Sequence, residues 1–102
     1  MAQEIKIAST AEIPPGEMKL VEVEGEEVVV ANIGGQFFAF ANKCTHRGGP
    51  LAEGELKGEV VECPWHRGQF NVKTGEVAAP PPSRPIPTYT LKVEGGDIYL
   101  VR

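Results

Sequence analysis

This sequence contains few residues that could cross-link a fold, and it has no long apolar run. Among 102 residues it has two cysteines, two histidines and one tryptophan. No stretch approaches the roughly 18–20 consecutive apolar residues that a membrane-spanning helix needs. The first ten residues lack the basic and apolar regions of a secretory signal. We therefore expect a cytoplasmic protein that does not enter a membrane.

An excess of positive charge is also absent. The sequence has ten basic and 14 acidic residues, which gives a net charge of −4. It contains no basic stripe with interleaved aromatic residues. This balance argues against nucleic acid as a partner. The hydrophobic content of 41% and the charged content of 24% are ordinary for a soluble globular protein, and the length suits one domain.

Helical periodicity is the third absence. Nowhere do apolar residues recur at positions i, i+3, i+4 and i+7 over a helical length. Twelve glycines and nine prolines instead punctuate short apolar or alternating runs. We expect strands at residues 5–7, 18–23, 28–30, 36–40, 59–62, 70–72, 89–93 and 98–101. Turns are expected at residues 24–26, 34–35, 73–75 and 94–96. The fold class predicted from this pattern is all-β, with small antiparallel sheets.

Every cysteine and every histidine lies in one of two short segments. Residues 44–46 read Cys-Thr-His and residues 63–66 read Cys-Pro-Trp-His, with sixteen residues between them. The candidate metal ligands are therefore Cys44, His46, Cys63 and His66. Zinc sites more often pair like with like, as C-x-x-C and H-x₃₋₅-H. One cysteine and one histidine in each segment fit a [2Fe–2S] cluster better, with two histidines replacing two cysteines on one iron.

Two other interpretations of the four residues remain open. They could form a structural zinc site, as in a zinc-stabilised interaction module. Alternatively, Cys44 and Cys63 could form a disulfide, although this leaves the matched spacing of the histidines unexplained. If both cysteines bind metal, none remains for a structural disulfide, as expected in a reducing cytoplasm.

The runs CTHRGGP (44–50) and CPWHRGQF (63–70) resemble the two cluster-binding loops of Rieske iron–sulfur proteins. The resemblance implies a base of antiparallel sheets that carries a small cluster-binding part. We expect the base at 1–41 and 73–102 and the cluster-binding part at 42–72, all within one domain. It also implies that Cys44 and Cys63 hold one iron, while His46 and His66 hold the other.

The resemblance further implies a low reduction potential. High-potential members carry an extra cysteine in each loop, and Gly49 and Trp65 occupy those places here. High-potential members also place a serine and a tyrosine after the second loop's ligands, where this sequence has Gly68 and Phe70. Hydroxyl donors to the cluster sulfurs stabilise the reduced state, so their absence lowers the potential. A proline-rich segment at 80–87 is expected to cover the cluster-binding part.

The function implied is that of a small electron carrier rather than an enzyme, with no catalytic residues. Such a ferredoxin, expected as a monomer, passes single electrons from a flavin-dependent NAD(P)H reductase to an oxygenase. The alternative is a small subunit of an enzyme such as assimilatory nitrite reductase. The basic residues Lys43, Arg47, Arg67 and Arg84 suggest a basic cluster end on an acidic body, which would orient the carrier toward its partner. The simpler alternative is that Arg47 and Arg67 pair with Glu53 or Glu62.

Overall fold

The structure is a computed structural model that describes residues 3–45, 48–65, 67–80, 82 and 84–101. These residues form antiparallel strands and two short 3₁₀ helices, η1 (Thr10–Glu12) and η2 (Leu51–Glu53). The predicted all-β fold is confirmed. In the part of the chain that the structure describes, no helix is long and apolar enough to cross a membrane.

Six strands form the larger sheet, in the order β1-β10-β9-β4-β3-β2. Their bounds are β1 (Glu4–Ser9), β2 (Met18–Val23), β3 (Glu26–Ile33), β4 (Gln36–Ala41), β9 (Thr88–Glu94) and β10 (Asp97–Val101). Three hairpins with two-residue turns connect them, at 24–25, 34–35 and 95–96. Both residues of each turn have positive φ, which suits the right-handed twist of the strands and explains the glycines. The turns predicted at 24–26 and 94–96 are thus one residue shorter, because Glu26 and Glu94 pair within strands.

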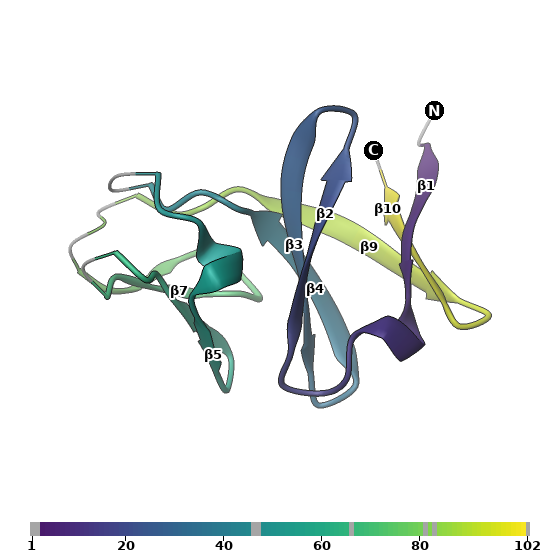
Figure 1. The fold of residues 1–102 in the computed structure, drawn as a ribbon, viewed down its shortest axis with the longest axis horizontal. Coiled ribbons are helices and arrows are strands. Elements are labelled where there is room, and N and C mark those ends of the chain that lie inside the picture. The colour runs from purple at the N-terminus through teal and green to yellow at the C-terminus, as the bar shows by residue number, and fades with distance from the viewer. Residues whose placement is uncertain (1–2, 46–47, 66, 81, 83, 102) are drawn as a thin grey trace.

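The smaller sheet has four short strands in the order β5-β6-β7-β8. Their bounds are β5 (Glu55–Lys57), β6 (Val60–Glu62), β7 (Gln69–Asn71) and β8 (Val77–Ala79). Figure 1 shows this sheet at one end of the elongated molecule, away from both termini. The sequence did not indicate β5 or β8, because three residues are too few to show a period of two. β8 lies beyond residue 72, where the cluster-binding part was expected to end.

Strand β3 separates two apolar cores. Val28 and Val30 belong to the core beneath the larger sheet, together with Ile98 and Leu100. Val29 and Ala31 point the other way, into a core that also contains Phe40, Phe70, Leu51 and both cysteines. Since successive side chains of a strand point to opposite faces, a strand buried on both faces needs an unbroken apolar run. The run at 28–31 therefore joins the base of the molecule to the end that carries the cysteines.

Candidate metal centre

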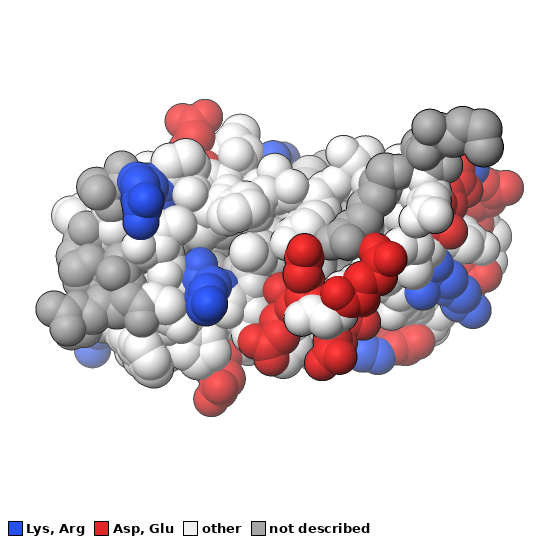
Figure 2. All heavy atoms as spheres, turned by 90° about the horizontal axis from the view of Figure 1, so that it is seen from above, with Lys and Arg blue, Asp and Glu red and all other residues white. Residues whose placement is uncertain are grey.

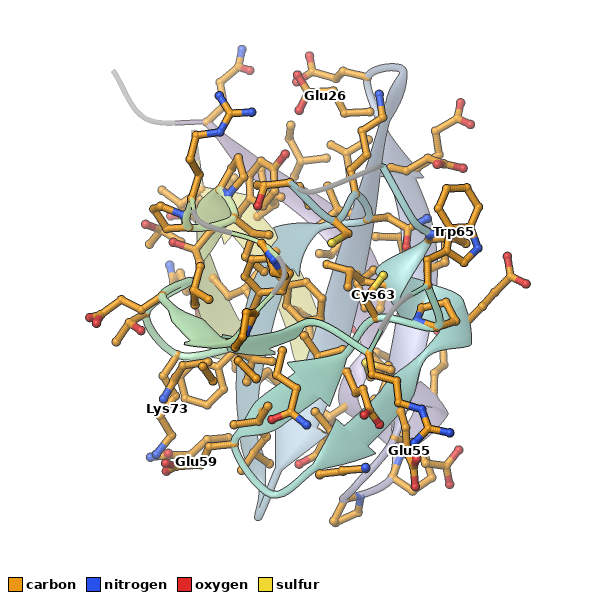
Figure 3. The ribbon with its side chains drawn as sticks, turned by 90° about the vertical axis from the view of Figure 1, so that its left-hand side faces the viewer. Glu26, Glu55, Glu59, Cys63, Trp65 and Lys73 are labelled. Atoms are coloured by element: carbon orange, nitrogen blue, oxygen red, sulfur yellow. The ribbon has the colours of Figure 1, made fainter. Side chains whose placement is uncertain are left out.

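The two cysteines lie at the ends of two loops that meet beside the smaller sheet. Cys63 directly follows β6, and Cys44 comes three residues after β4. Both side chains are buried, with 3% of Cys44 and none of Cys63 exposed. Both are free thiols, so the disulfide considered above is not formed. Figure 3 shows Cys63 near the middle of this end of the molecule.

Each loop closes with a backbone hydrogen bond at its cysteine. In the first loop, the Cys44 amide donates to the Gly49 carbonyl at 2.9 Å, and the Gly48 amide donates to the Cys44 carbonyl at 2.7 Å. In the second, the Cys63 amide donates to the Gly68 carbonyl at 2.7 Å. Gly48 has a φ of +73°, which few other residues adopt without strain. The local sequence thus holds each thiol at the base of a tight loop.

Gly49 is the point where the two loops touch. A Cβ atom at this position would lie 2.7 Å from the Cys63 Sγ and 3.2 Å from the Trp65 ring. Only glycine therefore allows the first loop to pack this closely on the second. The extra cysteine that high-potential relatives carry here has no room in this arrangement.

The surroundings of Cys63 raise the pKa of its thiol. Burial raises the pKa of the Cys63 thiol, and the nearby Cys44 side chain raises it further. The Trp65 amide donates to the Cys63 Sγ at 3.4 Å, which opposes that rise. Two buried thiols side by side are costly to ionise alone, but a bound cation stabilises both thiolates. The donor set therefore fits a thiolate-bound metal centre.

The two histidines of the predicted ligand set, His46 and His66, lie outside the described residues. The structure thus brings together Cys44 and Cys63, and the full set of four stays a prediction. Trp65 packs its ring over Gly49, yet 48% of its surface remains exposed. It points outward at the edge of this end, as Figure 3 shows, so it covers the site only in part.

The proline-rich segment contacts the first loop. The Thr45 hydroxyl donates to the Arg84 carbonyl at 2.7 Å. Two residues later, Ile86 is buried in the same core as the cysteines, and its amide donates to the Gly75 carbonyl at 2.9 Å. Within the described residues, this segment therefore packs against the cysteine-bearing end, as expected.

An ion pair stands next to Cys63. The Lys57 ammonium lies 2.7 Å from the Glu62 carboxylate. This contact lowers the pKa of Glu62 and raises the pKa of Lys57, and the charge of Arg67 lowers the pKa of Glu62 further. Glu62 therefore pairs with Lys57, and the charge of Arg67 acts on it as well. The simpler alternative named Arg47 and Arg67 with Glu53 or Glu62, and Arg47 lies outside the described residues.

One residue of this site escaped the sequence analysis. Asn42, between β4 and Cys44, is buried and joins both ends of the first loop through its side chain. The only sequence signal was a polar residue directly after an apolar strand. Its hydrogen-bond partner lies ten residues away, which no local pattern reveals.

A model of the Rieske [2Fe-2S] domain matches residues 3–90 of this sequence. The chain therefore belongs to the Rieske [2Fe–2S] domain family, and the cofactor predicted from its sequence is confirmed. It is 44% identical over 96 residues to the biphenyl dioxygenase ferredoxin subunit of Pseudomonas sp. (strain KKS102), covering 93% of this chain and 88% of that protein.

Solved structures agree with this assignment. The Sphingomonas yanoikuyae B1 ferredoxin superposes with a TM-score of 0.93 at 32% identity, covering 98% of this chain and 99% of that one. A ferredoxin chain in a complex of reduced oxygenase and oxidized ferredoxin in carbazole 1,9a-dioxygenase gives a TM-score of 0.91 at 36% identity, covering 95% and 91%. The prediction of a ferredoxin-type electron carrier, rather than an enzyme, is confirmed by these relatives.

Proposed function

We propose that this protein carries single electrons from a flavin-dependent NAD(P)H reductase to the terminal oxygenase of an aromatic-ring dioxygenase system. The observation that carries the proposal is the pair of buried, free thiols held by two touching loops at one end of the molecule. A ferredoxin that is 36% identical to this chain is found in a complex of oxygenase and ferredoxin, which supports the second half of the route. We further propose that the protein works as a monomer in the cytoplasm.

In this proposal Cys44 and Cys63 hold one iron, and His46 and His66 hold the other. When bound, the [2Fe–2S] cluster accepts and releases one electron. The chain's own residues exclude water from the thiolates and bring the site close to the surface beside Trp65. The smaller sheet with its two loops forms the cluster-binding part, and the larger sheet forms the base.

The potential of this carrier is expected to be low. Gly68 and Phe70 are both buried beside the second loop, and neither has a hydroxyl group to donate to a sulfur. We therefore predict a midpoint potential toward the lower end of the range of roughly −150 to +300 mV that Rieske centres span. The measurement is a redox titration followed by low-temperature EPR, with iron and zinc assayed on the same sample.

A rhombic EPR signal, with about two irons per chain, is the result expected of mixed histidine and cysteine ligation. A potential above about +100 mV would contradict the low-potential assignment. A colourless, EPR-silent sample with one zinc per chain would instead point to the interaction module. Reduction by a flavoprotein reductase added separately tests the first half of the route.

Charge is distributed unevenly along the molecule. The segment 42–87 contains six basic and five acidic residues, whereas the rest of the chain contains four basic and nine acidic ones. Figure 2 shows acidic side chains gathered over the hairpin of β2 and β3, and basic side chains at both ends, including the end that carries the smaller sheet. Lys43, Arg67 and Arg84 are exposed at that end. Such an asymmetry orients the cluster-bearing end toward an acidic surface of a partner.

Reversing two of these charges should slow electron transfer. In the double variant Lys43→Glu and Arg67→Glu, the second-order rate constant for electron transfer to the oxygenase is expected to fall about tenfold at low ionic strength. The difference should shrink as salt is added, because the attraction is screened. The control is Lys6→Glu with Lys92→Glu, the same charge change on β1 and β9, where the rate should change little. A steering role is ruled out if the rate and its salt dependence match the unmodified protein.

A further inference from the structure

Among the described residues, two buried side chains are polar, Asn32 and Asn42. Asn32 lies in β3. Its side-chain amide donates a hydrogen bond to the Ile13 carbonyl at 2.7 Å, and its Oδ1 accepts one from the Gly35 backbone amide at 2.8 Å. Both partners of Asn32 lie in the base of the molecule. Asn42 makes a similar pair of contacts, but at the entrance to the first ligand loop.

The contacts of Asn42 join three segments. Its Oδ1 accepts a hydrogen bond from the Ala52 amide at 2.7 Å, in η2. Its side-chain amide donates to the Glu27 carboxylate at 3.4 Å, and its backbone amide donates to the Glu27 carbonyl at 3.2 Å. Asn42 lies just before the loop of residues 44–50, and Ala52 lies just after it. One side chain therefore ties the two ends of the loop together and fixes them to β3.

The return end of the loop matters for the geometry of the thiols. Leu51, next to Ala52, is fully buried in the core that contains Cys44 and Cys63. Gly49, two residues earlier, rests on the Cys63 Sγ. A shift of η2 would therefore move Gly49 against Cys63 and change the separation of the two loops. The short, partly buried hydrogen bond from the Ala52 amide opposes that shift.

We propose that Asn42 is a positioning residue of the cluster site, acting through the Ala52 amide to set the first ligand loop against the second. This role rests on the proposed ligand function of Cys44. It extends that function, because it assigns to a residue that contacts no metal a control over the environment and retention of the cluster. The bond to Glu27 anchors Asn42 to the base, and the bond to Ala52 transmits its position to the loop.

The test compares Asn42→Ala, the double variant Asn42→Asp with Glu27→Gln, and Asn32→Ala in the cluster-loaded protein. The readouts are the EPR g values of the reduced protein, the rate at which a chelator bleaches its visible absorbance, and the thermal midpoint. Asn42→Ala removes both side-chain bonds, and we expect shifted g values and about tenfold faster bleaching. The double variant keeps an acceptor for the Ala52 amide and lets the new side-chain amide at position 27 donate to the carboxylate at position 42, so we expect the g values of the unmodified protein.

Asn32→Ala is the matched control, because it also removes two side-chain hydrogen bonds of a buried asparagine, but away from the loop. We expect it to lower the thermal midpoint while leaving the g values unchanged. The proposal is overturned if Asn42→Ala leaves both g values and bleaching rate like those of Asn32→Ala, or if the double variant shows the altered signal. If the unmodified protein itself gives no [2Fe–2S] signal, the ligand assignment fails first, and this outcome is distinct from the others.

Discussion

Replacing Cys63 with serine is expected to remove the cluster altogether. Cys63 is fully buried, and its sulfur lies against Gly49 at the contact of the two loops. Serine has a much less acidic hydroxyl and provides no soft thiolate, so iron loses a ligand that the site cannot replace. We expect the iron content to fall from about two per chain toward zero, with loss of colour and of the EPR signal. Iron assay and EPR on purified protein measure this directly.

The thermal midpoint of Cys63→Ser should fall as well, because metal binding and folding are coupled in a domain this small. The matched control is Val61→Thr, which introduces a hydroxyl at a fully buried position two residues earlier in β6. This control is expected to lose stability while retaining its iron. Cys63→Ser protein that retained the full iron content and an unchanged EPR signal would contradict the ligand role of Cys63.

Replacing Gly54 with alanine is expected to be strongly destabilising. A Cβ atom at this position would overlap the backbone carbonyl oxygen of Glu62, and it would lie 3.2 Å from the Leu51 carbonyl oxygen. Backbone atoms cannot move aside cheaply, and Glu62 immediately precedes Cys63. We expect a loss of about 3 kcal/mol in the free energy of unfolding. Denaturant unfolding of the loaded protein measures it, and faster release of iron should accompany it.

Gly58→Ala provides the control for this effect. Gly58 lies in the turn between β5 and β6, has a φ of +61°, and has open space where a Cβ would stand. Alanine there meets only backbone strain, which costs about 1 kcal/mol. The two variants therefore separate steric overlap from backbone conformation. Equal losses in both would show that the close approach of Gly54 to β6 does not govern stability.

Local patterns explain why much of the fold was predictable. Strands β2, β3, β4, β9 and β10 have apolar or alternating runs, and each hairpin turn between them contains glycine. Both signals depend on residues that are close in sequence. The short strands β5 and β8 gave no such signal. They form because β6 and β7 pair with each other and each leaves one edge open, to which β5 and β8 hydrogen-bond. Those open edges exist only in the assembled sheet.

The same distinction holds at the site. The sequence by itself determined the class of protein, because both cysteines and both histidines stand at intervals typical of one kind of cluster. It also determined the absence of hydroxyl groups at Gly68 and Phe70, on which the prediction of a low potential rests.

Only the tertiary structure decided how the loops are held. The contact of Gly49 with the Cys63 sulfur joins two loops that are far apart in sequence, and the bond from Ala52 to Asn42 spans ten residues. The exposure of Trp65 was likewise decided by the neighbours it meets after folding. Ligand identity is a matter of side-chain chemistry, which sequence records directly. Contact and burial arise from chain segments that meet only in the folded state.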